Sequence, residues 1–306
     1  MKKEILYSLK SPYREPLDII GFRFGSGNQS CAIVGAMRGN EVQQMYVCAK
    51  LVQELKKLEK RGEVQKEILV VPCVNYYSMN IEKRFWTMDN TDINRMFPGY
   101  DLGETTQRIA DGLFSQIKDY EFGIQLASFY QQGNFLPHVK MMVTDFAKPE
   151  LMREFGMKYA ITRTPRPYDT TTLNYNWQIW ETTAFSLYTN ATDYIDEISA
   201  AEAVECILRF MSAQGIVKVK TRPGYNTAVI SESGITQLHA GNAGIFRSLV
   251  KMGEHIEENQ PLAEILDPLE ASLRSTITAD SSGTVFFEYN KPLIDENTVC
   301  FKIIKD

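Results

Sequence analysis

Residues 31–41, with the sequence CAIVGAMRGNE, and residues 67–74, with the sequence EILVVPCV, decide the fold. Each contains a short apolar run bounded by turn-forming or polar residues, which is typical of a buried central strand. Between them, apolar residues recur at helical spacing over residues 42–58, opposite a charged face that ends near Gly62. This order of strand, helix and strand predicts a parallel pair of strands with a right-handed crossover.

Residues 38–41 lie on the loop after the first of these strands. In an open α/β sheet the ligand site is built from loops at the carboxyl ends of the strands. Two more helices are expected, one over residues 109–117 and one over residues 204–211. The second has a Ser199-x-x-Glu202 capping box at its start and ends at Gly215.

Helical periodicity disappears from about Val217, where short β-type segments alternate with Gly, Asn and Asp turns. We therefore expect an α/β domain over residues 1–216 and an all-β domain over residues 217–306. Within the second, residues 244–265 and 283–303 form a near-repeat of two half-units, which fits a small barrel. The first half-unit resembles biotinyl and lipoyl carriers, but the connecting segment LDPLEASL lacks the Met-Lys attachment site, so no carrier function is expected.

Composition excludes several partners. With 33 basic against 38 acidic residues, no strong positive field exists to attract nucleic acid. Neither a signal-peptide-length apolar run nor a membrane-spanning one is present, so we expect a cytoplasmic protein without a membrane partner. The five cysteines are widely spaced and are expected to be reduced and mostly buried.

The first candidate site is Arg38-Gly39-Asn40-Glu41. A histidine at its first position would place an imidazole and a carboxylate on one metal ion. Arg38 has no lone pair to offer, because a guanidinium is a permanent cation with donors only. On local evidence alone, Glu41 is better explained as a first-turn acid that complements the helix dipole.

The second candidate site contains Arg84 and Arg95, in a loop-rich stretch after the second buried strand. A guanidinium fork suits bidentate capture of a carboxylate, which predicts an anion site. The alternative is an exposed loop held by surface salt bridges.

Taken in order, these motifs resemble the succinylglutamate desuccinylase and aspartoacylase family, which belongs to the zinc carboxypeptidase superfamily. The resemblance rests on Gly35-x-x-Arg38-Gly39-Asn40-Glu41, Asn75, Arg84, Asp92-Ile93-Asn94-Arg95-x-Phe97-Pro98-Gly99 and Leu136-Pro137-His138-Val139. It continues into the β domain, through the Gly244-Ile-Phe and Val250-x-x-Gly253 elements, and so spans nearly the whole chain.

The resemblance implies a central mixed sheet flanked by helices, and a zinc ion that activates water to cleave an N-acyl amino acid. In that chemistry a glutamate is the general base, and an Asn-Arg pair binds the substrate carboxylate. Arg84, Asn94 and Arg95 match the substrate-binding motif. The resemblance also makes a homo-oligomer plausible.

The reacting centre departs from the family pattern. Of the two histidines and one glutamate that bind zinc in the family, only Glu41 is present. Arg38 replaces the first histidine, and Ala127 replaces the second, where Gln125-Leu126-Ala127 matches Asp-Leu-His. Tyr188 replaces the catalytic glutamate, unless the poorer match to Glu232 holds.

His138 is the other candidate metal ligand, against the alternative of a neutral structural histidine. His239 and His255 lie in the β domain, remote from the candidate site. Glu41 and His138 together fall short of the three protein ligands of catalytic zinc, so no cofactor is expected, although the resemblance implies zinc.

We hypothesise that Arg38 places its charge near the vacated metal position and pairs with Glu41, so that one cation replaces another. With Arg84 and Arg95 it would form a cationic site for a small carboxylate-bearing molecule. Four aromatic residues are candidate walls of this site or, equally, core residues: Phe85, Trp86, Phe129 and Tyr130.

Three functions remain open from the sequence. The first is a hydrolase that cleaves amide or ester bonds of small N-acyl substrates, as the resemblance implies. The second is a non-catalytic protein that binds or senses a small carboxylate. The third is a different reaction at the same place that uses Glu41, Tyr188 or Cys73.

Overall fold

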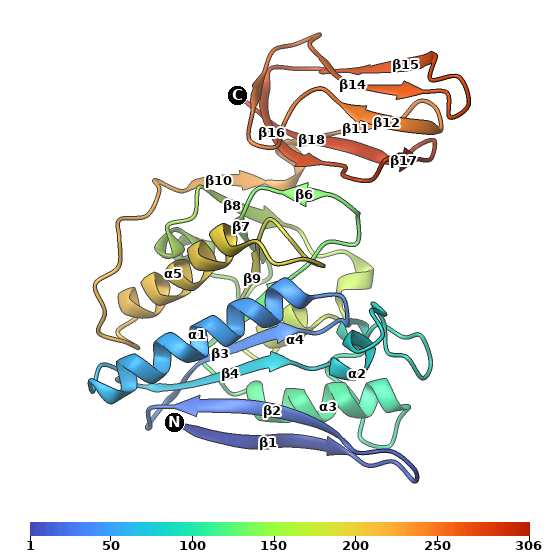
Figure 1. The fold of residues 1–306 in the computed structure, drawn as a ribbon. Helices are drawn as coiled ribbons and strands as arrows, with labels where there is room; N and C mark the ends of the chain where they lie inside the picture. The colour runs from blue at the N-terminus through green and yellow to red at the C-terminus, as the bar shows by residue number, and fades with distance from the viewer. The chain divides into compact units, whose positions relative to one another are not determined.

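The computed structural model describes residues 1–306, which form two compact units. The α/β unit contains residues 1–128 and 137–229, and the β unit contains residues 129–136 and 230–306 (Figure 1). The predicted domain boundary after residue 216 lies earlier in the chain than this division, and no sequence signal assigned residues 129–136 to the second unit. None of the helices is long and apolar enough to cross a membrane.

A mixed sheet forms the centre of the α/β unit, with the strand order β1-β2-β4-β3-β5-β9-β7-β8-β10. Its strands are β1 (Lys2–Leu9), β2 (Leu17–Phe24), β3 (Gln29–Ala36), β4 (Glu67–Cys73), β5 (Phe122–Ala127), β7 (His138–Met142), β8 (Tyr159–Arg163), β9 (Thr183–Tyr188) and β10 (Ala228–Ser231). The four strands β4, β3, β5 and β9 are parallel, whereas β2 and β7 run antiparallel to their neighbours β4 and β9. The predicted parallel pair, β3 and β4, is confirmed, and so is the mixed α/β fold.

Helices cover both faces of this sheet (Figure 1). They are α1 (Val42–Lys60), α2 (Tyr76–Met79), α3 (Thr105–Ile117), α4 (Leu173–Ile179) and α5 (Glu197–Ala213), with 3-10 helices η1 (Ile93–Arg95), η2 (Pro149–Phe155) and η3 (Pro167–Asp169). Strand β3 shows why both faces are apolar. Cys31 and Ile33 pack in the core with α1 and α5, and Ala32 and Val34 pack in the core with α3 and α4.

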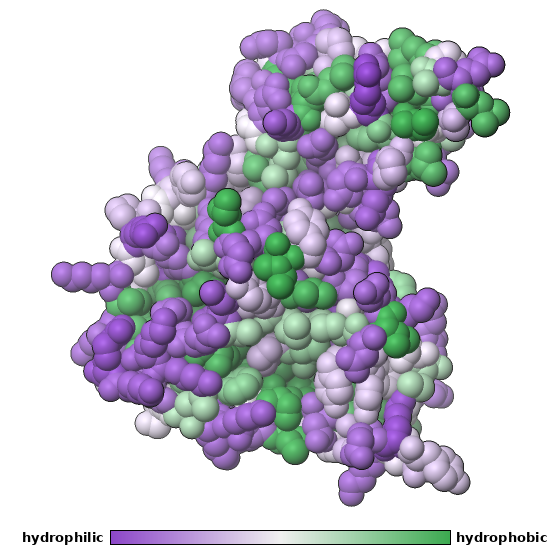
Figure 2. Space-filling view, viewed as in Figure 1, coloured by the Kyte–Doolittle hydropathy of each residue, from purple (hydrophilic) through white to green (hydrophobic).

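The polar side of α1 faces solvent, as its sequence predicts. Figure 2 shows hydrophilic residues gathered over the C-terminal end of this helix. Its buried side includes Val47, Leu51 and Leu55, which follow one another at a spacing of four residues. The first helix was therefore predicted correctly in both position and orientation.

The predicted start of α5 is wrong. The helix begins at Glu197, and its N-cap is Asp196, whose Oδ1 accepts hydrogen bonds from the backbone N–H groups of Ile198 and Ser199 at 3.0 and 3.1 Å. Ser199 thus lies inside the helix and not at its cap. Aspartate and serine are comparable N-caps, so the Ser199-x-x-Glu202 pattern alone did not identify the first residue.

The β unit contains two sheets that are built from the near-repeat. Its elements are β6 (Asn134–Phe135), η4 (Glu232–Gly234), β11 (Ile235–His239), β12 (Gly244–Ser248), β13 (His255–Ile256), β14 (Pro261–Leu266), β15 (Leu273–Thr278), β16 (Gly283–Glu288), β17 (Leu293–Ile294) and β18 (Val299–Lys305). Each short strand pairs with the other half-unit, since β13 pairs with β16 and β17 pairs with β12. The longer strands pair within their own half-unit, β12 with β14 and β16 with β18, and the short strands β13 and β17 join the sheet of the other half-unit.

The parallel strands β3, β4, β5 and β9 finish at the same end of the sheet, which we call the site end. In the register of the sheet, Ala36 is opposite Cys73 and Ala127 is opposite Tyr188. The segments that follow these strands, including residues 37–41, therefore come together there.

The corrected cap of α5 gives a stability prediction. Replacing Asp196→Ala removes the oxygen that accepts two backbone hydrogen bonds, so the free energy of unfolding should fall by about 1 kcal/mol in urea denaturation. The control Asp196→Asn keeps a side-chain oxygen and should stay within about 0.5 kcal/mol of the wild type. Equal stability of both variants and the wild type would show that Asp196 does not cap this helix.

Candidate functional site

The loop after β3 approaches its neighbours so closely that residue 39 has to be glycine. A Cβ atom on Gly39 would lie 2.2 Å from the carbonyl oxygen of Lys83 and 2.5 Å from the carbonyl carbon of Ser78. The backbone N–H of Gly39 also donates to the carbonyl of Arg84 at 3.0 Å. These contacts hold the Arg38–Glu41 loop against the segment that contains Arg84.

Glu41 is the N-cap residue of α1, but its carboxylate does not cap the helix. Its Oε2 accepts the backbone N–H groups of Met37 and Arg38 at 2.8 and 3.0 Å. Its Oε1 accepts Arg38 Nη1 at 3.0 Å and the hydroxyl of Ser128. Each oxygen thus has two hydrogen bonds, and the fully buried carboxylate has no lone pair left for another partner.

Arg38 forms a second ion pair, with Asp92. Its Nε and Nη2 donate to Asp92 Oδ2 at 3.1 and 2.9 Å, and Asp92 Oδ1 accepts the backbone N–H of Asn94 at 3.0 Å. The expected pair between Arg38 and Glu41 is present, and the pair with Asp92 was not predicted. In this buried cluster one guanidinium therefore pairs with two carboxylates.

The residues that the family resemblance places at the zinc-ligand positions do not fit a zinc ion. Arg38 offers only donors, Ala127 ends β5 with a methyl side chain, and both oxygens of Glu41 are saturated. Nowhere in residues 1–306 do three His, Cys, Asp or Glu side chains form a group that could hold a metal. Catalytic zinc requires three protein ligands, so no step through a metal follows from these residues.

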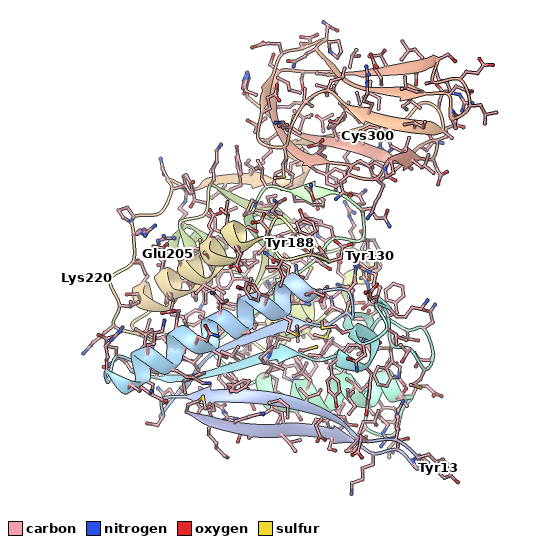
Figure 3. All side chains as sticks on the ribbon, viewed as in Figure 1. Tyr13, Tyr130, Tyr188, Glu205, Lys220 and Cys300 are labelled. Atoms are coloured by element: carbon pink, nitrogen blue, oxygen red, sulfur yellow. The ribbon has the colours of Figure 1, made fainter.

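Tyr188, which the sequence predicts in the place of the family's catalytic glutamate, ends β9 and is half-buried (Figure 3). His138 is opposite it in the register of β7 and β9, and the two rings stack with centroids 4.7 Å apart and an interplanar angle of 8°. His138 is fully buried. The stacking gives this histidine a packing role, while its role as a metal ligand stays a prediction.

Cys73, at the end of β4, does not suit nucleophilic catalysis. Burial raises the pKa of its thiol to about 12. The thiolate is the reactive form, and almost none is present at neutral pH. All five cysteines are free, and four are buried, as the sequence predicted.

The two candidate ligand-binding arginines lie in different surroundings. Arg84 Nη1 donates to Asn40 Oδ1 at 3.5 Å, beside the Arg38–Glu41 loop. Arg95 Nη1 donates to the carbonyl of Tyr168 in η3 at 2.6 Å, and its guanidinium lies 5.4 Å from the centre of the Tyr168 ring. Both side chains are half-buried. An anion site and a loop held by surface salt bridges both stay predictions for these two arginines.

A buried chain of neutral polar side chains starts at Asn94 and was missed by the sequence reasoning. Gln125 Nε2 donates to Asn94 Oδ1 at 3.3 Å, and Asn174 Nδ2 donates to Gln125 Oε1 and to Ser186 Oγ, each at 2.7 Å. We call these four residues the amide chain. Gln125 had a sequence signal, because it matches the aspartate of the family's Asp-Leu-His strand, but nothing in the sequence singled out Asn174 or Ser186.

The remaining candidates are a core residue of the α/β unit and several residues of the β unit. Trp86 is fully buried in the α/β core, and its indole N–H donates to Thr105 Oγ1 at 3.1 Å, so it is a core residue. Phe129 belongs to the β unit, where its ring stacks on Phe135. The β unit also contains Glu232, in η4, together with His239 and His255.

Comparisons with known proteins match the chain to one family model and to several solved structures. A family model described as the succinylglutamate desuccinylase/aspartoacylase catalytic domain matches residues 28–186. The product-bound ectoine utilization protein EutE (DoeB) of Ruegeria pomeroyi matches with a TM-score of 0.83 and 16% identity, covering 100% of this chain and 95% of that chain. A Silicibacter succinylglutamate desuccinylase matches with a TM-score of 0.82 and 17% identity, covering 99% and 93%.

An aspartoacylase family protein of Mesorhizobium loti matches with a TM-score of 0.77 and 19% identity, covering 95% of this chain and 91% of that chain. No curated relative matches the sequence. At these identities the solved structures establish the fold alone.

The Arg38 cluster gives a second stability prediction. Replacing Arg38→Met leaves two buried carboxylates without their cation, so the free energy of unfolding should fall by about 3–5 kcal/mol, measured by chemical denaturation. The matched control is Lys57→Met, which breaks the solvent-exposed pair with Glu54 and should cost about 0.5 kcal/mol or less. Similar losses in both variants would contradict the role assigned to the buried pairs.

Proposed function

This chain belongs to the succinylglutamate desuccinylase/aspartoacylase family, and on that premise we propose that it binds a small carboxylate-bearing molecule at the site end without zinc-dependent hydrolysis. The ligand class is a small N-acyl amino acid. The scaffold is the family's hydrolase scaffold, and the sequence-based resemblance to the family is confirmed.

A single observation supports the loss of zinc chemistry: the Glu41 carboxylate already accepts four hydrogen bonds, two of them from Arg38. Zinc in a deacylase polarises the carbonyl group and lowers the pKa of its bound water. A guanidinium cannot take over either task by coordination, because it has no lone pair and no open coordination position. Arg38 therefore supplies charge and rigidity at this place, and no nucleophile.

Ligand binding is assigned to Arg84, Asn94 and Arg95, which match the family's substrate-binding motif. Arginine presents donors in a planar fork that fits a carboxylate, and an asparagine amide adds two more donors. Arg38, also expected in this group, directs its Nε, Nη1 and Nη2 to Asp92 and Glu41. We propose that Arg38 holds the loops together and that the other three residues contact the ligand.

Hydrolysis of amide or ester bonds in the same N-acyl substrates is the second candidate function. Family membership favours it, because the matched region is the catalytic domain. It would need either a zinc site that these residues do not provide or a nucleophile other than Cys73. Metal content and turnover together distinguish the two functions.

The remaining parts of the proposal concern context. The five free cysteines suit a cytoplasmic location, where thiols stay reduced. Neither a nucleic acid nor a membrane is proposed as a partner, and a homo-oligomer is proposed by family resemblance alone. For the β unit we propose a biotinyl- or lipoyl-like barrel that lacks the carrier lysine.

The ligand prediction uses N-acetylaspartate and N-succinylglutamate, the acyl amino acids that the family name describes. At a ligand concentration of about 100 Kd, the free energy of unfolding should rise by about 2.7 kcal/mol, seen as a higher melting temperature. Elemental analysis should find substoichiometric zinc, and product assays should find no hydrolysis that a chelator abolishes. Stoichiometric zinc with chelator-sensitive turnover would refute the proposed function in favour of the hydrolase.

Two variants control this experiment. Arg95→Ala removes a charged donor and should weaken ligand binding at least about tenfold in calorimetric titration. Arg166→Ala removes the exposed arginine whose Nη1 donates to the Tyr168 hydroxyl, and it should leave the affinity unchanged. An equal effect of both variants would point to general electrostatic attraction and away from a specific carboxylate contact.

A further experiment tests whether Arg38 and Ala127 occupy the positions of the family's two zinc-binding histidines, by restoring these histidines. The double variant Arg38→His with Ala127→His supplies two imidazoles next to Glu41, and it should bind about one zinc ion per chain in a metal titration. The single variant Arg38→His offers two protein ligands and should bind zinc much more weakly. Failure of the double variant to bind more zinc than the wild type would show that Ala127 is not the second ligand position.

A further inference from the structure

The amide chain has a fixed direction, because one of its hydrogen bonds comes from the backbone. The N–H of Leu173 donates to Asn94 Oδ1 at 3.4 Å. A backbone N–H can only donate, so the group that Asn94 turns toward Leu173 has to be its oxygen. The Leu173 N–H therefore fixes which end of the Asn94 amide is the oxygen, so the orientation does not rest on an arbitrary choice between oxygen and nitrogen.

The direction then passes along the chain. Since Asn94 Oδ1 accepts, Gln125 has to present its Nε2 to Asn94, at 3.3 Å, and is left to present Oε1 to Asn174. Asn174 in turn has to present Nδ2, which donates to Gln125 Oε1 and to Ser186 Oγ. Reversing any one amide would bring two oxygens or two N–H groups face to face.

Asn174 keeps this orientation even though one of its own polar atoms is left without a hydrogen bond. Both hydrogens of its Nδ2 are used, while its Oδ1 is buried without a hydrogen-bond partner in the chain. A buried carbonyl oxygen without a partner is destabilising. Turning the amide would place that oxygen against Gln125 Oε1. One buried oxygen without a partner destabilises the protein less than two acceptor oxygens in contact.

The consequence appears at Asn94. Its Oδ1 accepts from Gln125 and Leu173, its Nδ2 makes no hydrogen bond within the chain, and this nitrogen is not completely buried. We infer that Gln125 and Asn174 are positioning residues that hold Asn94 with its two Nδ2 donors presented to an acceptor oxygen of the ligand. This inference rests on the proposed function, because it assumes that the ligand contacts Asn94.

Gln125 suits this role in a way that an ionised acid in its place would not. A carboxylate has acceptors only, so it could not donate to Asn94 Oδ1. A protonated carboxyl group, in contrast, has one donor and one acceptor and can replace both ends of the Gln125 amide. The exchange Gln125→Glu therefore introduces a positioning group that works only in its protonated state.

The test compares the affinity for N-acetylaspartate between pH 5 and pH 8 in the wild type and in Gln125→Glu. In the variant the affinity should be close to that of the wild type at the acidic end. It should fall by about tenfold at the alkaline end, because the ionised carboxyl turns Asn94 and withdraws its donors. Gln125→Met, which has neither donor nor acceptor, should bind weakly at every pH.

Side-chain amide NMR separates this inference from the proposed function. In the free wild-type protein the Gln125 amide protons should exchange slowly with solvent and the Asn94 amide protons rapidly, whether or not the protein binds an acyl amino acid. Wild-type protein with this exchange pattern but no ligand affinity would refute the proposed function and leave the orientation intact. Slow exchange at Asn94, or a Gln125→Glu variant whose affinity follows the wild type at every pH, would overturn the inference.

Discussion

The Arg38 guanidinium, held between two carboxylates, is the interaction on which the candidate site depends. It reaches Glu41 with Nη1 and Asp92 with Nε and Nη2, and all three side chains are buried. Glu41 ends the loop after β3, and Asp92 begins η1 more than fifty residues later. One side chain therefore joins two loops that the sheet alone would leave as neighbours.

Burying three charges is not an efficient way to stabilise a protein. The desolvation of ions in a protein interior costs several kcal/mol each, and well-packed apolar residues often replace a buried ion pair without loss. Such a cluster instead fixes the positions of its side chains, since each oxygen of Glu41 accepts hydrogen bonds from two specific donors. Because Asp92 also accepts the backbone N–H of Asn94, the charged cluster extends to the residue where the neutral amide chain begins.

Sequence reasoning predicted the elements that depend on one repeating pattern. The strands β3 and β4 and the helix α1 follow from apolar runs and helical spacing. The pair between Arg38 and Glu41 was expected because a buried carboxylate is costly without a cation beside it. The start of α5 was wrong, because Asp196 and Ser199 are equally good caps and only tertiary packing selects one.

The contacts that were missed join residues far apart in the chain. Asp92 was part of the quoted motif, yet its partner Arg38 is 54 positions away, and nothing local indicates the pair. Asn174 and Ser186 lie on α4 and β9, and they meet Gln125 only because β5 and β9 are neighbours in the sheet. The assignment of residues 129–136 to the β unit is of the same kind, since the short strand β6 finds its partner β16 about 150 residues later.

The charged cluster around Arg38 and the proposed ligand-binding residues at the site end have different hydrogen-bond partners. In the cluster of Arg38, Glu41 and Asp92 the guanidinium already donates to two carboxylates, so an incoming carboxylate would have to displace one of these partners to bind Arg38. Arg84 donates to Asn40 Oδ1 and Arg95 donates to the carbonyl oxygen of Tyr168, which are both neutral acceptors. A carboxylate forms a stronger, charge-assisted hydrogen bond with a guanidinium than a neutral oxygen does. Under the proposed function, Arg38 keeps its two carboxylate partners, and the carboxylate of the ligand binds to Arg84, Asn94 and Arg95 instead.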